Sequence, residues 1–147
     1  MDVLTGVGKQ LFIKRTVFDK ICESLGKNAC ETGGVIGYVG DTISEFEFDK
    51  YSSRELYEYY PNTVFFEKII NEKWNKKNVS FAGIVHSHLY HNAVSNQDIT
   101  YCRDIIKANS LFDEMILGIL DISASHQIMR WYLISEDVVE EQKITVV

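Results

Sequence analysis

The feature that most constrains the fold is an apolar run that ends in two histidines. Residues 79–85 are nearly all apolar and lead directly into His86-Ser87-His88. A short, nearly continuous apolar run is typical of a strand in the interior of a sheet. Side chains alternate along a strand, so His86 and His88 point to the same side of it. The sequence therefore predicts a central strand that carries two imidazoles on one face.

A second motif, Ser95-x-x-Asp98, follows after a short loop. By itself it is typical of a capping box, in which both side chains bind free N–H groups of the first helical turn. A carboxylate held at a helix start can also project toward the preceding strand end. Catalytic zinc typically takes three nitrogen or oxygen ligands and leaves one position to water. His86, His88 and Asp98 would form such a set, which indicates a zinc hydrolase, whereas His91 is interpreted as a solvated loop residue.

The remaining pattern predicts an α/β (α+β) fold with a mixed central β-sheet flanked by about three helices. Thr16 is the expected N-cap of a helix over residues 17–25, Asn62 caps a helix over 63–75, and a third helix begins at Ser95. Strands are expected at 11–14, 35–39, 42–48, 79–85, 115–122 and 128–134, with an edge strand at 143–147. We interpret the tyrosines of residues 49–61 as covering the edge of the core, with contact to a partner as the alternative.

Composition favours one domain over residues 1–147 and excludes several functions. The chain is 46% apolar and 24% charged, with a net charge of −6 and no basic stretch, which argues against a nucleic-acid partner. No apolar run approaches the ~20 residues that span a membrane. The first four residues lack the layout of a secretion signal, and the three cysteines form no CxxC pair. We therefore expect a reducing, cytoplasmic location.

Two adjacent glycines, Gly33 and Gly34, follow Glu31-Thr32 at the start of the strand expected at 35–39. They could mark a β-bulge. They could also allow another backbone or a substrate to approach closely, because glycine has no side chain to block it. In the second case Glu31 would lie at the rim of a site. The sequence leaves both interpretations open.

Together, Glu31-Thr-Gly-Gly-Val-Ile-Gly, His86-Ser-His88 and Ser95-x-x-Asp98 resemble the JAMM motif of the JAB1/MPN zinc metalloproteases. The order of strands and helices along the whole chain is also similar to the small MPN domain. Two features depart from the family pattern. Leu89 stands where the family usually has proline, and the loop from His88 to Ser95 is one residue shorter than is common.

The resemblance implies that His86, His88 and Asp98 bind one Zn²⁺ per chain. Glu31 would then act as the general base that takes the proton from the attacking water, and Ser95 would stabilise the oxyanion. An extended substrate tail would add as a strand beside Gly33 and Gly34. Because every motif position keeps its residue type, the resemblance implies an active enzyme.

Family members typically hydrolyse the bond after the C-terminal glycine of ubiquitin or a ubiquitin-like protein. A compact chain of this kind resembles the bacterial JAB peptidases that accompany ubiquitin-like modifiers. The expected partners are a ubiquitin-like protein or its conjugate, with E1-like and E2-like proteins of the same pathway, and neither nucleic acid nor membrane. Two alternatives stay open: a non-catalytic MPN scaffold, and a hydrolase that acts on a small amide or a sulfur-carrier conjugate.

Overall fold

The computed structural model describes residues 10–27, 30–54, 59–89, 91, 93–109, 111–123 and 128–147. Its strands are β1 (Leu11–Ile13), β2 (Gly33–Val39), β3 (Thr42–Phe48), β4 (Ser53–Arg54), β5 (Tyr59–Tyr60), β6 (Ser80–His88), β7 (Glu114–Asp121), β8 (Ile128–Ser135), β9 (Val139–Gln142) and β10 (Ile144–Val146). Its helices are α1 (Arg15–Gly26), α2 (Thr63–Lys68), the π-helical turn η1 (Ile69–Trp74), the 3₁₀ turn η2 (Asn75–Lys77) and α3 (Asn96–Lys107). None of the described helices is long and apolar enough to cross a membrane.

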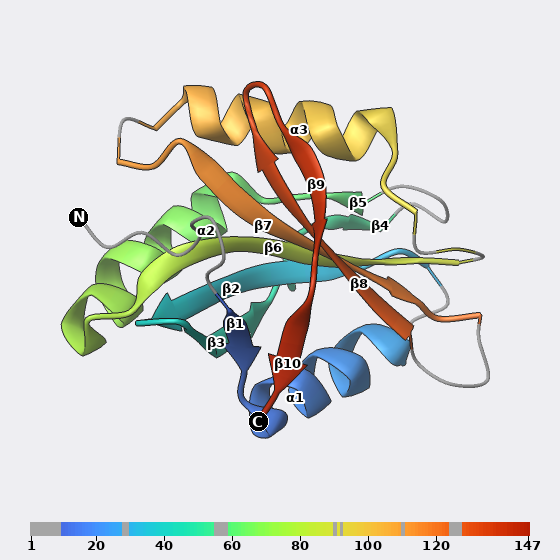
Figure 1. Cartoon of the computed structure of the whole chain (residues 1–147), viewed down its shortest axis with the longest axis horizontal. Helices are drawn as coiled ribbons and strands as arrows, with labels where there is room; N and C mark the ends of the chain where they lie inside the picture. Colours follow the sequence, from blue (N-terminus) through green and yellow to red (C-terminus); the bar gives the residue numbers. More distant parts are fainter. Residues whose placement is uncertain are drawn as a thin grey trace.

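A mixed eight-stranded sheet organises the molecule, as the sequence predicted (Figure 1). Its strand order is β10-β1-β3-β2-β6-β7-β8-β9. Strand β6 lies in the interior, antiparallel to β2 and parallel to β7. The apolar run at 79–85 is therefore a central strand, and β6 continues through both histidines to His88.

The two edges of the sheet meet near the C-terminus. Strand β9 pairs with β8 at one edge, and β10 pairs with β1 at the other. Only Lys143 separates β9 from β10 along the chain, so the sheet must curl until its edges come together (Figure 1). The edge strand expected at 143–147 is confirmed as β10. Strand β9 was missed because its sequence, Val-Glu-Glu-Gln, does not alternate between apolar and polar residues.

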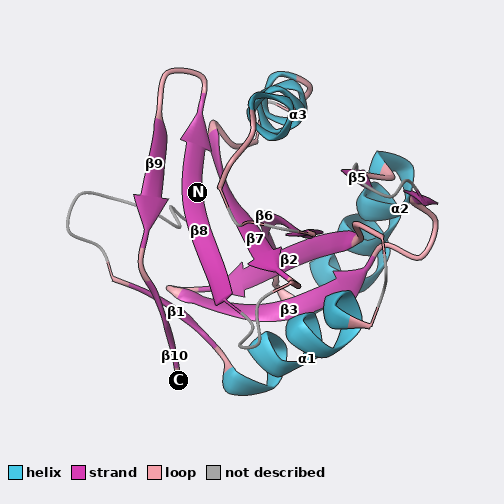
Figure 2. Cartoon of the chain, turned by 90° about the vertical axis from the view of Figure 1, so that its right-hand side faces the viewer, coloured by secondary structure: helices cyan, strands magenta, loops and turns pink. Residues whose placement is uncertain are grey.

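Each face of the sheet carries its own apolar core. Helix α1 lies on one face of the sheet, whereas α2 and α3 lie on the other (Figure 2). Val85 is buried in the core under α1, and Ile84 is buried in the core that α2, η1 and α3 cover. Because side chains alternate along β6, His86 and His88 lie on the same face as Ile84. The two imidazoles therefore point toward the side of the sheet that carries α3.

The helix starts show where local signals succeed and fail. Asn62 caps α2 as predicted, since its side-chain oxygen accepts a hydrogen bond from Phe65 N at 3.0 Å. The prediction for Thr16 is wrong: α1 begins at Arg15, and Thr16 lies inside the helix. The N–H of Arg15 donates instead to the carbonyl of Val147 at 2.8 Å, so a contact with the far end of the chain replaces the side-chain cap.

The segment expected as a loop at 49–61 contains the small sheet formed by β4 and β5. Asp49 is fully buried and accepts hydrogen bonds from the Tyr59 hydroxyl and from Asn62 N, both at 2.8 Å. Tyr59 packs in the core on the α3 side, which confirms the core-covering interpretation for this residue, whereas Tyr51 is exposed. Tyr57 lies outside the described residues.

None of the three cysteines, all of which the structure describes, forms a disulfide. Cys22 and Cys102 are buried in the two cores, and burial raises the pKa of both thiols. Cys30, next to Glu31, is half-buried.

Candidate metal centre

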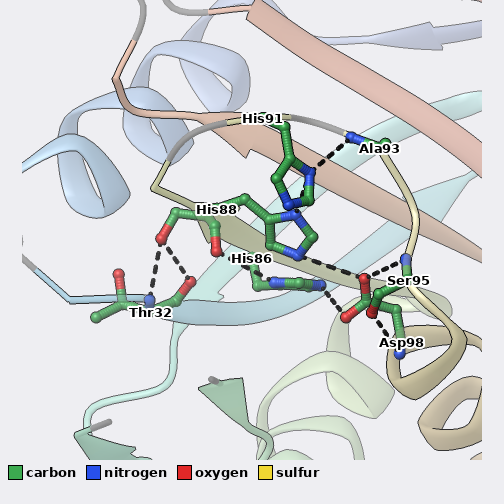
Figure 3. A network of polar contacts seen from close by, with 8 residues as sticks. Thr32, His86, His88, His91, Ala93, Ser95 and Asp98 are labelled. Atoms are coloured by element: carbon green, nitrogen blue, oxygen red, sulfur yellow. Dashed lines mark hydrogen bonds and ion pairs between the residues drawn. The ribbon is translucent and has the colours of Figure 1, made fainter. Parts of the chain in front are cut away.

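The two histidines of β6 meet the carboxylate of Asp98 at the start of α3 (Figure 3). His86 Nε2 lies 2.9 Å from Asp98 Oδ1, and His88 Nε2 lies 3.3 Å from Asp98 Oδ2. The residues His86 and His88 are 3% and 5% exposed, so the contacts are largely shielded from solvent. The structure thus brings together the three residues that the sequence predicted as ligands.

Asp98 is held in place by the capping box of α3. Its Oδ2 accepts a hydrogen bond from Ser95 N at 3.0 Å, and Ser95 Oγ accepts one from Asp98 N at 3.1 Å. A carboxylate in the first turn is also favoured by the helix dipole. The two interpretations of Ser95-x-x-Asp98 are therefore compatible, because one carboxylate both caps the helix and faces the histidines.

The hydrogen bonds around His86 indicate that a cation belongs between it and Asp98. His86 Nδ1 lies 3.3 Å from the carbonyl oxygen of Ser87, which can only accept, so Nδ1 carries the proton. In the neutral ring, Nε2 then directs a lone pair at Asp98 Oδ1. Two electron-pair donors 2.9 Å apart are favourable only with a second proton or a metal ion between them.

The pKa shifts of His86, His88 and Asp98 follow from their burial and from their contacts with one another. Burial alone lowers the pKa of His86, but its hydrogen bond and charge interaction with Asp98, together with the charge of Glu31, outweigh burial and raise it. Burial lowers the pKa of His88, and its contacts with Asp98 do not reverse that shift. Burial alone raises the pKa of Asp98, but the two histidines outweigh it and hold that pKa far below its usual range. Asp98 is therefore available as an ionised ligand.

The donor spacing fits zinc. Nitrogen and oxygen ligands lie about 2.0–2.1 Å from zinc in a tetrahedral arrangement, which places two of them about 3.3 Å apart. The observed Nε2–Oδ separations of 2.9 and 3.3 Å are close to that edge length. Two imidazoles and one carboxylate are also a donor set that catalytic zinc uses. The residues present therefore fit the ion that the sequence analysis predicted.

Glu31 lies beside the histidines. One oxygen of its carboxylate and one ring nitrogen each of His86 and His88 all lie within 4.8 Å of one another. Glu31 is 7% exposed. Two overlapping groups of donors thus share the histidines, one with Glu31 and one with Asp98. The assignments of Asp98 as the third ligand and of Glu31 as general base stay predictions.

Ser87, which lies between the two histidines, holds the residue next to Glu31 in place by hydrogen bonds. It is fully buried on the opposite face of β6, its Oγ accepts a hydrogen bond from Thr32 N at 3.0 Å, and its own N–H donates to Thr32 O at 2.8 Å. This role was missed from the sequence. The available signal was a small polar residue on the buried face of an otherwise apolar strand.

The glycines allow a close approach, and they do not form a bulge. The register of β2 shifts near Gly37 instead. A Cβ on Gly33 would lie 2.5 Å from Val85 O and 2.6 Å from the Tyr59 ring, whereas one on Gly34 would collide with Glu47 O and Phe46. The neighbouring parts of the same chain therefore require these glycines.

The predicted addition of a substrate strand beside β2 is wrong. Gly33 faces His86 on β6, and its carbonyl accepts a hydrogen bond from Asp49 N at 2.8 Å on the other side. Gly34 pairs with Phe48 of β3 and with Val85 of β6. Because both sides of β2 are occupied, no edge is open there. A contact between the substrate and Gly33 or Gly34 stays a prediction, but the substrate would not pair with β2 as an added strand.

Tyr59 forms one wall of the site and was not expected there. Its ring stacks on the imidazole of His86, with centroids 5.6 Å apart and planes 24° from parallel. The buried carboxylate of Asp49 holds the hydroxyl, and burial together with that charge raises the pKa of Tyr59 well above its ordinary value. No local pattern places this tyrosine near His86, because the contact depends on how the β4–β5 segment folds over the sheet.

Comparisons with known proteins bear on the fold. The chain is similar to protein DSY2949 from Desulfitobacterium hafniense, with 13% identity, a TM-score of 0.76, and coverage of 94% of this chain and 93% of that one. It is similar to AF2198, a JAB1/MPN domain protein from Archaeoglobus fulgidus, with 18% identity, a TM-score of 0.54, and coverage of 95% and 100%. A structure described as a JAMM metalloprotease-like zinc site in the proteasome and signalosome gives 15% identity, a TM-score of 0.53, and coverage of 95% and 99%.

No protein-family model matches the sequence, and no curated protein sequence matches it. The chain has the JAB1/MPN fold, as the sequence resemblance implied. On that fold it carries a candidate metal centre made of His86, His88 and Asp98, with Glu31 close by.

Proposed function

We propose that this protein is a JAMM-type zinc metallopeptidase that hydrolyses the bond after the C-terminal glycine of a ubiquitin-like protein. The observation that carries the proposal is the convergence of His86, His88 and Asp98 at 2.9 and 3.3 Å, with Glu31 in the same cluster. These groups come from three separate parts of the chain. Packing alone gives no reason to bury so many titratable side chains together, whereas metal-assisted hydrolysis needs each of them.

In this proposal the chain's own residues divide the work. His86, His88 and Asp98 would hold the zinc, which when bound would lower the pKa of water toward ~7 and polarise the scissile carbonyl. Glu31 accepts the proton of the attacking water on its carboxylate and delivers it to the leaving amine. The Ser95 hydroxyl accepts a bond from Asp98 N, which leaves its own proton free to be donated to the developing oxyanion.

The substrate and setting come from the sequence resemblance. A ubiquitin-like modifier, its conjugate or its precursor would supply the extended tail, and E1-like and E2-like proteins of the same pathway would be further partners. The proposed setting is the cytoplasm, because three cysteines without a CxxC pair favour a reducing compartment.

Metal analysis followed by a cleavage assay tests the proposal. The purified protein should hold one zinc per chain. Glu31→Gln should keep that zinc and lose about 10²–10⁴-fold in kcat, since general-base catalysis contributes about that much. Glu23→Gln, an exposed glutamate of α1, is the matched control and should cleave like the wild type.

The substrates should be ubiquitin-like proteins that end in Gly-Gly, with and without a C-terminal extension, and an isopeptide-linked conjugate. Absence of zinc from the wild type, or full turnover by Glu31→Gln, would contradict the proposal. Bound zinc without cleavage of any of these substrates would favour the scaffold alternative. Cleavage of small amides or sulfur-carrier conjugates alone would keep the chemistry and change the substrate.

A further inference from the structure

We propose that His91 is a positioning residue that holds the proton of His88 on Nδ1, so that His88 Nε2 is free to bind the metal. The inference rests on the proposed metal centre and concerns a residue that the motif does not contain. It also revises the sequence-based interpretation of His91: the residue is exposed, as expected, but its ring contacts a ligand.

The contact lies on the side of His88 that faces away from Asp98. His91 Nδ1 is 3.2 Å from His88 Nδ1, and the two ring centroids are 4.5 Å apart with planes at 70° (Figure 3). His88 Nε2 meanwhile faces Asp98 Oδ2 at 3.3 Å. His91 therefore lies behind the ligand and contacts its second nitrogen, as partners of metal-bound histidines commonly do.

A backbone hydrogen bond settles which ring donates. The N–H of Ala93 donates to His91 Nδ1 at 3.2 Å, so that nitrogen must be an acceptor without a proton. A proton between the two histidines can then come only from His88 Nδ1. Because His88 carries its proton there, the neutral ring directs the lone pair of Nε2 toward Asp98, which is the form that binds a metal.

In both histidine ligands a hydrogen-bond acceptor keeps the proton on Nδ1, but the two acceptors differ. His86 Nδ1 faces the main-chain carbonyl of Ser87, which no side-chain substitution removes. His88 Nδ1 faces a side chain on the loop that leads to α3. Without that acceptor, either nitrogen of His88 can hold the proton, and molecules with the proton on Nε2 must lose it before the metal binds.

The test compares His91→Leu with His91→Asn. Both side chains branch at Cγ and are similar in size, but only Asn offers an oxygen near the position of Nδ1. Zinc affinity should fall about 10–100-fold in His91→Leu, the usual cost of losing such a partner. His91→Asn should stay near the wild type. Chelator competition measures the affinity, and thermal unfolding of the metal-free proteins should be unchanged because His91 is exposed.

Nitrogen-15 NMR of the histidine rings gives a readout that does not depend on zinc. At about pH 9, well above the ordinary pKa of histidine, Asp98 competes for the proton of metal-free His88 on Nε2 in all three proteins. The fraction of His88 with its proton on Nδ1 should therefore be larger in wild type and His91→Asn than in His91→Leu, which lacks the acceptor. Equal zinc affinity in all three proteins, an equal loss in both variants, or the same ring form in all three would overturn the inference.

The proposed function can fail separately. If the wild-type protein binds no zinc, the metal centre is wrong, but the ring form of His88 in the metal-free variants still decides the role of His91. If zinc binds and no substrate is cleaved, the affinity comparison is unaffected.

Discussion

The candidate site has two halves that are built in different ways. The strand half consists of His86, Ser87 and His88, all buried in β6 and paired by backbone with β2 and β7. The loop half consists of His91, Ser95 and Asp98, which are half-buried or exposed and are held by hydrogen bonds within a short stretch of chain. The sheet thus fixes the strand half, whereas local contacts fix the loop half. Substitutions should affect them differently.

The largest effect should come from the strand half. His86→Ala removes a ligand, so zinc affinity should fall by more than the ~100-fold upper range for losing an outer partner such as His91. Chelator competition measures this value. If His86→Ala bound zinc with wild-type affinity, the ion would lie elsewhere, and the comparison of the two halves as parts of one metal site would fail.

Ser87→Ala should cost stability. The buried N–H of Thr32 would lose its side-chain acceptor, which lowers the free energy of unfolding by about 1–3 kcal/mol. Urea unfolding of the metal-free protein measures the change. We also expect a lower kcat with little change in zinc affinity, because Thr32 adjoins Glu31 and not the ligands. An unchanged unfolding free energy would mean that the Ser87 contact does not support the strand half.

Ser95→Ala should lower the free energy of unfolding by less than Ser87→Ala, because local contacts alone hold the loop half. Loss of the N-cap of α3 costs about 1 kcal/mol. The kcat should also fall, because the proposed oxyanion donor is removed. Ser95→Thr keeps both the cap and the hydroxyl, so it should restore both values in the same assays. If Ser95→Ala lowered the free energy of unfolding as much as Ser87→Ala, the two halves would not differ in how they are held.

The stability of the protein at alkaline pH should depend on Tyr59, whose ring stacks on His86 of the strand half. Burial and Asp49 raise its pKa in the folded protein, so this contribution is fully present below the ordinary tyrosine pKa of about 10 and is lost as the pH rises above it. Between pH 9 and about pH 11 the wild type should therefore lose more stability than Tyr59→Phe. Urea unfolding across this range measures the difference. Parallel curves for the two proteins would contradict the raised pKa.

Much of each half was predictable because its signals are local. The apolar run before His86 predicts an interior strand, and alternation places His88 on the same face. Ser95-x-x-Asp98 predicts a capping box, which needs only four consecutive residues. The ligand set could therefore be proposed from the sequence, since each of its parts depends on neighbouring residues.

Other features depend on contacts between distant residues, so no local pattern predicts them. Only the family resemblance brought Glu31 to the site; it reaches the histidines because β2 runs antiparallel to β6, and Ser87 secures that approach across 55 residues. The placement of β2 between β3 and β6 also rules out the predicted strand addition. His91 is close to His88 in sequence, but its role depends on a loop shape that no motif encodes.

The sequence by itself determined the central strand, the capped helix and the types of the metal-binding groups, since periodicity and capping act over a few residues. Tertiary structure decided which groups meet and which surfaces stay open. It placed Glu31 beside the histidines, stacked Tyr59 on His86, and closed both sides of β2. The physical reason is that strand pairing and packing between distant segments depend on the free energy of the whole fold. No single segment of the sequence determines that free energy.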